Sequence, residues 1–288
     1  MMFNPMPRRL KPRRTTFDWD RTPMHWIPDE PTATHVVNAL HLLLPPGERW
    51  FIDVFREALP LVRDAELEVL MKGFMGQEGT HSVQHAVVLD HLAEAGLDGR
   101  PFVDRLEQVF HGPLGHHPPR RLPIPGREWL RLRLAVIAAI EHYTAVLGDW
   151  ILGAHAFERA GADPTMLDLL RWHGAEEVEH RAVAYDVFVH LGGRGPARYV
   201  RRVTGFAIAT VLLLWFWFWG AAYLMDADPH RPGGKYLVSD HNRAVRKGLL
   251  PSWGRLGAAI PRYLRPGFHP DQEGSMESAL TYLAGRQR

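Results

Sequence analysis

The strongest constraint on the fold of this chain is a carboxylate–histidine pattern that occurs twice. Residues 78–81 read Glu-Gly-Thr-His, and residues 177–180 read Glu-Val-Glu-His. A single glutamate in apolar sequence precedes each motif, Glu48 the first and Glu141 the second. This is the ligand order of carboxylate-bridged two-metal sites in four-helix bundles. The pattern therefore predicts two helix pairs that bring four glutamates and two histidines to one centre.

The surrounding sequence indicates that these glutamates face the protein interior. Glu141 follows the apolar run 134–140 and shares a helical face with Ala145 and Gly148. A lone carboxylate on such a face is costly to bury unless it is paired or bound to a metal. One Glu-x-x-His motif is ordinary helix-surface composition, but the complete set on apolar faces is not. Glu48 is the weakest member, because near an expected helix start a carboxylate also suits the helix dipole.

Apolar periodicity predicts long helices and no strands. We expect helices over residues 47–62, 64–95, 128–160 and 164–191, with a proline-rich connection and one short helix over 96–126. A long crossover of this kind is found in ferritin-like bundles. The expected fold is therefore all-α: a ferritin-like four-helix bundle with an additional hydrophobic C-terminal helix.

The expected organisation has four parts. They are an irregular basic N-terminal arm at 1–32, the metal-binding bundle at 33–195, a hydrophobic helix at 196–230 and a C-terminal extension at 231–288. The arm, which contains Arg8, Arg9, Lys11, Arg13 and Arg14, lacks the apolar run of a signal peptide. We expect it to be flexible, with binding to anionic lipid headgroups as the alternative. The extension is expected to be irregular, with a short helix near 276–284.

Composition excludes several classes of site. The chain has no cysteine, which excludes disulfides, thiolate zinc sites, iron–sulfur clusters and thiol nucleophiles. A formal net charge of +2 and the lack of a recognisable motif argue against a nucleic-acid partner. The 17 histidines and abundant carboxylates leave metal binding through nitrogen and oxygen open.

Two further histidines share the faces of the motifs. His173 lies four residues before Glu177, and His85 lies four residues after His81. Either could be a third imidazole ligand or a residue that orients a ligand, and we favour His173 as the ligand. The expected metal ligands are thus Glu48, Glu78, His81, Glu141, His173, Glu177 and His180. Candidates for supporting contacts are His85, Tyr143, Tyr185 and Asp186, while Glu176, Glu179 and His142 are expected to support ligands or lie at the surface.

Four short runs carry a resemblance to known proteins. They are Gly47-Glu48, Phe74-x-x-Gln77-Glu78-x-x-His81-x-x-x-His85, Glu141-His142-Tyr143-Thr144-Ala145 and Trp172-His173-x-x-Glu176-Glu177-x-Glu179-His180. Over about residues 35–230 the chain resembles the bacterial proteins described as predicted metal-dependent hydrolases. That resemblance implies hydrolysis, whereas the ligand set looks like that of a ferritin-like di-iron protein.

The run from His173 to His180 is also distantly similar to the di-iron arylamine N-oxygenases, in which an extra histidine joins one iron. The rest of the chain does not resemble those oxygenases, so their substrate is not carried over. Two divalent ions bring four positive charges, which four carboxylates neutralise. We therefore expect two Fe ions, with Mn or mixed Mn/Fe as alternatives and Zn if the protein is a hydrolase.

The expected function is activation of O2 to oxidise an unknown organic substrate, with an electron donor as partner. One alternative is a hydrolase, in which the two ions acidify a bridging water to make the nucleophile. The other is a non-catalytic, ferritin-like metal-binding protein. The pattern of ligands alone does not name the substrate.

Residues 203–225 form an uncharged run that is long enough to span a bilayer. Three arginines precede it, as expected for a cytoplasmic start, but a span would translocate the basic residues that follow. The alternatives are a helix in the membrane interface and a helix buried against the bundle. We expect a cytoplasmic protein associated with the inner face of the cytoplasmic membrane. The expected partner is a small, lipophilic substrate suited to the aromatic centre of the run. The sequence leaves open whether a second copy of the chain joins it in a homodimer.

Overall fold

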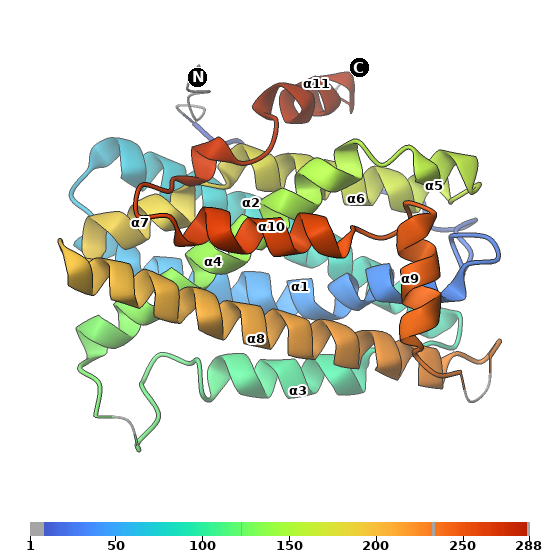
Figure 1. Cartoon of the computed structure of the whole chain (residues 1–288), viewed down its shortest axis with the longest axis horizontal. Coiled ribbons are helices and arrows are strands. Elements are labelled where there is room, and N and C mark those ends of the chain that lie inside the picture. Colours follow the sequence, from blue (N-terminus) through green and yellow to red (C-terminus); the bar gives the residue numbers. More distant parts are fainter. Residues whose placement is uncertain (1–8, 122, 232–233, 287–288) are drawn as a thin grey trace.

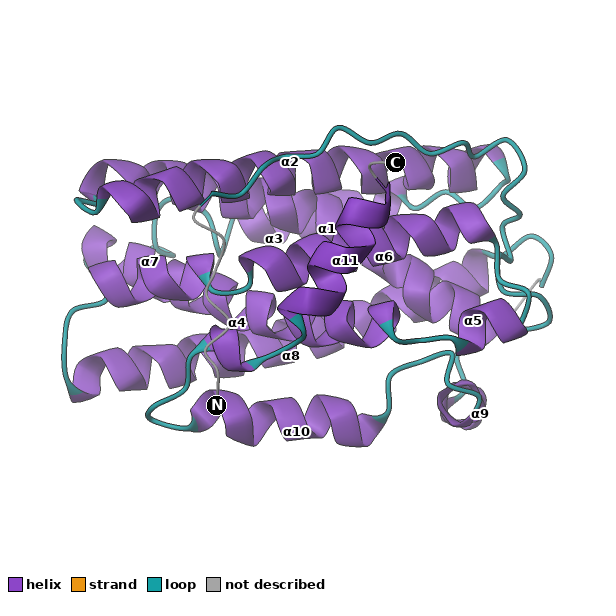
Figure 2. Cartoon of the chain, turned by 90° about the horizontal axis from the view of Figure 1, so that it is seen from above, coloured by secondary structure: helices purple, strands orange, loops and turns teal. Residues whose placement is uncertain are grey.

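The computed structural model describes residues 9–121, 123–231 and 234–286, and every regular element in these ranges is helical. The elements are α1 (Pro31–Ala58), α2 (Ala65–Glu94), α3 (Arg100–His111), α4 (Gly126–Leu152), α5 (Ala156–Arg159), α6 (Pro164–His180), α7 (Val183–Leu191), α8 (Pro196–Ala227), α9 (Val238–Arg246), α10 (Trp253–Leu264) and α11 (Met276–Arg286), with 3-10 turns at Leu59–Leu61 and Pro270–Gln272. The prediction of an all-α bundle is confirmed (Figure 2).

Four long helices, α1, α2, α4 and α6, form the core of the bundle. Helix α1 packs along α2, α4 packs along α6, and α8 lies against both α1 and α4 (Figure 1). The N-termini follow ordinary capping rules: the Asp64 carboxylate accepts from the backbone of α2, and Asp163 accepts from the Met166 N–H of α6, with Pro164 in the first turn. The expected short helix in the proline-rich connection is α3.

The first helix begins earlier than its apolar periodicity indicates. It starts at Pro31 rather than near residue 47, and Pro45 and Pro46 lie inside it. Proline in a helix interior removes a backbone donor and usually marks a helix end, which is why the sequence suggested a start after these residues. Glu48 therefore lies deep in α1, and the alternative role at a helix start is wrong.

Two of the expected helices are interrupted. The helix expected over 128–160 ends at Leu152, and a separate short α5 follows. The helix expected over 164–191 breaks after His180, and α7 resumes at Val183. At this break the guanidinium of Arg181 is buried and donates to the Pro270 carbonyl, which ties the end of α6 to the C-terminal segment.

The described part of the N-terminal arm is irregular but packed. Trp26 and Ile27 are fully buried, and Leu10 and Pro12 lie on α2 at Gly73 and Gly76. A side chain at Gly76 would meet Pro12 at 2.3 Å, so this glycine permits the close approach. The expectation of a flexible arm is therefore wrong for residues 9–30, while Arg8 lies outside the described residues.

The C-terminal part is more helical than expected, since α9, α10 and α11 occupy much of the stretch predicted to be irregular. The hydrophobic run forms the middle of α8, which packs on the bundle by one side: Gly205 lies against Ala135, and the Trp217 indole donates to the Val36 carbonyl at 2.7 Å. Two described helices, α4 and α8, are long and apolar enough to cross a membrane. The most apolar window of α4 is 67% buried, but that of α8 is only 33% buried.

Candidate metal centre

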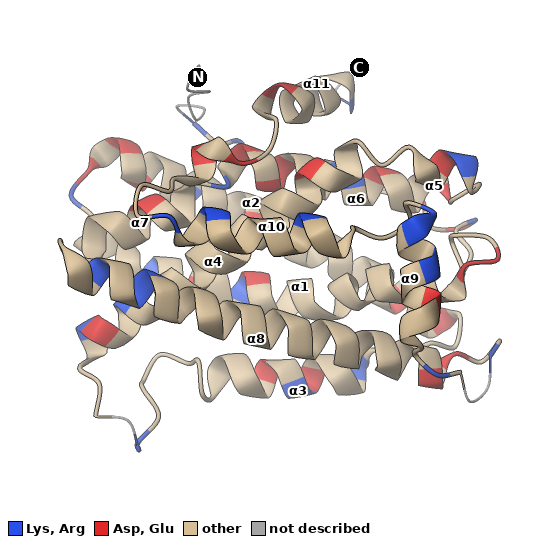
Figure 3. Cartoon of the chain, in the orientation of Figure 1, with Lys and Arg blue, Asp and Glu red and all other residues tan. Residues whose placement is uncertain are grey.

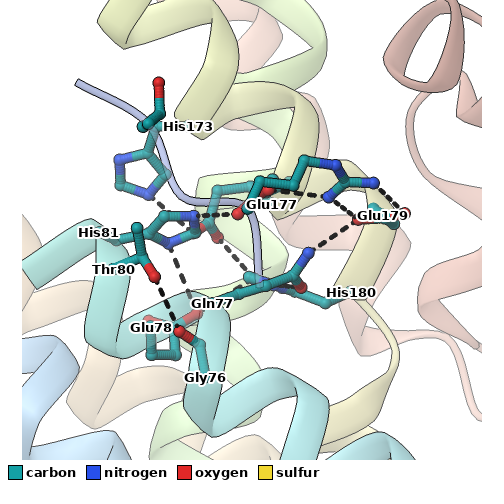
Figure 4. Close-up of polar contacts among 12 residues, drawn as sticks. Gly76, Gln77, Glu78, Thr80, His81, His173, Glu177, Glu179 and His180 are labelled. Carbon is teal, nitrogen blue, oxygen red and sulfur yellow. Dashed lines mark hydrogen bonds and ion pairs between the residues drawn. The ribbon is translucent and has the colours of Figure 1, made fainter. Parts of the chain in front are cut away.

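The bundle brings all seven expected ligand residues together, and all seven are buried. Helix α1 carries Glu48, α2 carries Glu78 and His81, α4 carries Glu141, and α6 carries His173, Glu177 and His180. Figure 4 shows the side chains of α2 and α6 converging on the space between these helices. Each of the four core helices thus contributes at least one side chain.

One group of donor atoms forms around His173. Its Nε2 lies 2.8 Å from Oε1 of Glu177 and 3.7 Å from Oε1 of Glu48. The His81 Nδ1 lies 3.6 Å from the same Glu177 oxygen. Donor atoms of Glu48, His81 and His173 all lie within 4.8 Å of one another, so one metal ion could contact all three.

A second group forms around His180. Its Nε2 lies 3.2 Å from Oε1 of Glu78, 3.2 Å from Oε2 of Glu141 and 3.4 Å from Oε2 of Glu177. Glu177 therefore directs one oxygen to each group. Glu78 also links them, since its Oε1 lies 3.8 Å from Nδ1 of His81. The arrangement fits two adjacent ions that share Glu78 and Glu177.

The hydrogen-bond pattern supports this fit. Both carboxylate oxygens of Glu48, Glu78 and Glu141 are buried and form no hydrogen bond. The same is true of His81 Nδ1, Glu177 Oε2 and His180 Nε2. An unsatisfied buried polar group costs about 1–3 kcal/mol, and more when charged. Cations placed between these atoms would satisfy them together.

The electrostatics lead to the same conclusion. Burial, followed by repulsion from Glu177, raises the pKa of Glu78 well above its usual range and that of Glu141 to about 7. Burial and Glu177 also raise the pKa of Glu48. Burial, followed by the His173 charge, lowers the pKa of His81 to about 4, so this imidazole is neutral and ready to bind a metal.

A buried network holds the second nitrogen of His81. Its Nε2 lies 2.9 Å from Oε2 of Glu176, and the other oxygen of Glu176 accepts from Arg13 at 2.8 Å. Glu176 was expected to support a ligand or to lie at the surface, and it is fully buried in this supporting position. Arg13 comes from the packed N-terminal arm, and sequence spacing contained no signal for its role.

The same arginine supports His180. The Nδ1 of His180 lies 3.1 Å from Oε1 of Gln77, and the Gln77 amide donates to Oε2 of Glu179 at 2.8 Å. Arg13 donates to both oxygens of Glu179, at 2.6 and 2.9 Å. One guanidinium therefore fixes the partners of two candidate ligands, and such outer contacts orient metal-binding histidines.

A chain of three histidines leads away from His173. Its Nδ1 forms a hydrogen bond with Nε2 of His85, whose Nδ1 lies 2.7 Å from Nδ1 of His41. Burial is the main cause that lowers the pKa of His85 well below its usual range and that of His41 to about 3. Sequence reasoning missed His41. It lies seven residues before Glu48, on the same face of α1, but the helix was expected to start after it.

The other supporting candidates differ in outcome. Tyr143 lines the cavity described below, and its hydroxyl pairs with Thr210 at 2.9 Å. The Tyr185 hydroxyl donates to the Phe268 carbonyl, and Asp186 pairs with His269. These two residues bind the C-terminal segment rather than any candidate ligand, so the expectation of a supporting role is wrong for them.

A cavity of about 310 Å³ leads to the metal centre. Four ligand carboxylates lie at its inner end, those of Glu48, Glu78, Glu141 and Glu177. The rest of the lining is largely apolar and comes mainly from α1, α4, α8 and α10, including Leu40, Ile140, Leu213, Trp217 and Leu256. The cavity is therefore apolar except at its inner end, where the carboxylates lie.

A separate histidine–aspartate group lies outside the centre. His25 and His35 direct their Nε2 atoms to one oxygen of Asp228, at 2.7 and 3.0 Å. The three residues could hold a metal ion by donor type. The two hydrogen bonds also account for the grouping without an ion, because they attach the N-terminal arm and α1 to the end of α8.

Fold and site together define an all-α protein with a buried, carboxylate-rich candidate metal centre. The family model described as "Predicted metal-dependent hydrolase" matches residues 11–274, and the chain belongs to this family. No curated protein and no solved structure matches the chain. The expected resemblance to the hydrolase family is confirmed and covers more of the chain than the four runs indicated. The similarity to di-iron oxygenases gains no support from these comparisons.

Proposed function

We propose that this protein is a dinuclear metal enzyme that uses two iron ions and O2 to oxidise a small apolar substrate. The observation that carries the proposal is a buried set of four carboxylates and three imidazoles, with unsatisfied donor atoms, at the inner end of an apolar cavity. If the proposal fails, the chain still belongs to the metal-dependent hydrolase family.

The donor set supports iron or manganese. Glu48, His81, His173 and Glu177 would hold one ion, and Glu78, Glu141 and His180 would hold the other, with Glu78 and Glu177 shared. Carboxylate and imidazole donors suit Fe(II), Mn(II) and Zn(II), and the four carboxylates balance the charge of two divalent ions. Two bound Fe(II) ions would supply electrons to O2, and continued turnover would need an external electron donor.

The chain's own residues would bind the substrate and exclude water. Apart from the ligands, the polar groups of the cavity wall have hydrogen-bond partners. Tyr143 pairs with Thr210, and the Thr144 hydroxyl donates to the backbone carbonyl of Glu141. The wall therefore provides no free acid or base beside the ligands. This favours oxidation of an apolar molecule over a reaction that needs a separate proton donor.

Hydrolysis is the second candidate, because the family description names it. The bound ions would then supply an acidified water as nucleophile. The hydrogen-bonded row of His173, His85 and His41 is the feature of this structure that fits hydrolysis, since linked imidazoles can hold or move a proton. Zinc or manganese would be the expected metal.

The experiment compares iron and zinc in the same protein. Metal-free protein is loaded anaerobically with two equivalents of Fe(II) and mixed with O2 while the visible spectrum is recorded. A transient chromophore at two irons per chain, lost in Glu141→Ala, supports the proposal. Iron oxidation without a chromophore and uptake of many more irons per chain indicates storage. Hydrolysis of p-nitrophenyl esters by the zinc form, without an O2 reaction of the iron form, would replace oxidation by hydrolysis.

A further inference from the structure

The outward side of α8 carries an apolar stripe. From Val200 to Leu214 its exposed residues recur every three or four positions, so they share one face: they are Val200, Thr204, Ala207, Val211 and Leu214, with Trp215 next to Leu214. Val211 and Trp215 are each 66% exposed. Large apolar side chains at such exposure along one helix face mark an interaction surface. The opposite side of α8 is occupied by its packing against α1 and α4.

The stripe continues onto α9 and α10. These helices, with the residue before α9, add four exposed apolar side chains: Leu237, Val238, Trp253 and Ile260. The Phe218 ring of α8 lies 6.1 Å from the Trp253 ring of α10, so the two helices meet here. Leu214, Trp253 and Ile260 also line the cavity that reaches the metal centre. The mouth of the cavity therefore opens on this apolar face.

The segment that forms this face is rich in cations. Residues 196–265 contain eleven Lys and Arg against three Asp and no Glu. Five of these cations form ion pairs, namely Arg201, Arg243, Lys247, Arg255 and Arg262. Figure 3 shows no charged residue along the middle of α8, with Lys and Arg at its start and on α9 and α10. Among the described residues neither Arg246 nor Arg265 forms a salt bridge. Their charge is thus available to an external anion.

We propose that the face formed by α8, α9 and α10 docks on an anionic lipid bilayer and places the cavity mouth at the membrane surface. An apolar stripe flanked by arginines and exposed tryptophans is the pattern of a surface that lies in the bilayer interface. A second copy fits this face less well, because a symmetric contact would bring two basic surfaces together. A separate span by α8 would break its packing against α1 and α4.

The docking proposal does not depend on the proposed function. The further idea that an apolar substrate enters the cavity from the bilayer rests on that function. The test therefore measures binding without turnover. Full-length, metal-free protein is sedimented with vesicles of pure phosphatidylcholine or of phosphatidylcholine with about 30% phosphatidylglycerol, whose negative surface attracts basic segments. We expect binding to the anionic vesicles only, weakened by high salt.

Matched variants separate this face from others. Arg246→Gln with Arg265→Gln should weaken binding about fivefold per arginine. Arg9→Gln with Arg14→Gln, which removes the same charge from the N-terminal arm, should leave binding unchanged. Val211→Ser with Trp215→Ser should weaken binding about tenfold or more. Val69→Ser with Val83→Ser, at exposed positions of α2, is the matched apolar control.

The cysteine-free chain permits a probe at one chosen position. Trp215→Cys and Val69→Cys are labelled with an environment-sensitive dye, and only the label at residue 215 should shift to the blue with anionic vesicles. Circular dichroism confirms that each variant is folded. The proposal is overturned if the labels respond alike, if the arginine pairs have equal effects, or if the protein forms a dimer that Val211→Ser with Trp215→Ser abolishes.

Discussion

Arg13 and Glu179 form a bidentate ion pair across 166 residues of sequence, with donor–acceptor distances of 2.6 and 2.9 Å. The arginine belongs to an irregular segment, and the glutamate lies one position before His180. Arg13 also contacts Glu176, so the N-terminal arm stabilises the outer contacts of both His81 and His180. The arm is thereby part of the candidate metal centre.

Removal of this arginine should weaken metal binding. Arg13→Ala leaves Glu176 and Glu179 buried without their cation, and the two histidines lose fixed orientation. Loss of such an outer contact typically costs about 10- to 100-fold in metal affinity. Competition with a chelator for Fe(II) or Mn(II) measures the effect. Arg14→Ala, at an exposed neighbouring position, is the control, and equal affinities of the two variants would contradict the role of Arg13.

Single substitutions in the two donor groups should reduce metal content. Glu141→Ala and His180→Ala each remove a ligand from the second group, and both should bind less than half of the wild-type metal. Elemental analysis of the purified proteins gives the stoichiometry. Asp186→Ala is the control, because Asp186 pairs with His269 outside the centre. Full metal content in both ligand variants would refute the assignment.

The metal-free protein should lose stability as pH rises, in part through Glu141. Burial and Glu177 raise its pKa from 4.5 to about 7 in the folded state. Between these values the folded protein holds a proton that the unfolded chain releases, so stability is lost as pH rises through the folded pKa. The full effect is about 3 kcal/mol. It should be absent from Glu141→Gln, which cannot ionise.

Urea unfolding of both metal-free proteins from pH 5 to pH 8 measures this contribution. Other groups titrate in the same range in both proteins. The difference between their unfolding free energies therefore isolates the contribution of Glu141. Burial lowers the pKa of His81 to about 4, and its contribution has the opposite sign, since it is lost as pH falls below about 6.5. A difference between wild type and Glu141→Gln that does not change with pH would exclude a raised Glu141 pKa.

The contact between α4 and α6 depends on two glycines. A Cβ at Gly148 would lie 2.3 Å from the Gly174 carbonyl oxygen, so Gly148→Ala must separate the helices. We expect destabilisation of about 1–3 kcal/mol, with weaker metal binding because Glu141 and Glu177 move apart. Chemical denaturation measures the first effect. Gly285→Ala is the control, because no atom lies within 4 Å of the new Cβ in the last turn of α11, and it should not destabilise the protein.

Local pattern accounts for the part of this protein that sequence predicts well. Helical periodicity and the doubled Glu-x-x-His order depend on neighbours within one or two turns, so they identified an all-α bundle and the residues that meet at its centre. The same dependence explains the error at the first helix. Pro45 and Pro46 indicate a helix end locally, but packing of α1 along α2 and α8 maintains the helix through them.

Tertiary structure alone decided the remaining features. Arg13 has no spacing that links it to the ligands, because its contacts join segments far apart in the chain. His41 lies on the face of α1 that carries Glu48, but only the structure shows that α1 continues through Pro45 and Pro46. The apolar run 203–225 is equally consistent with a span, an interfacial helix or a buried helix, and only its packing shows which side remains exposed. Sequence by itself determined which side chains could bind metal, since ligand chemistry resides in residue type and helical register. Tertiary structure determined how they are held and where the cavity opens, since both depend on contacts between distant elements.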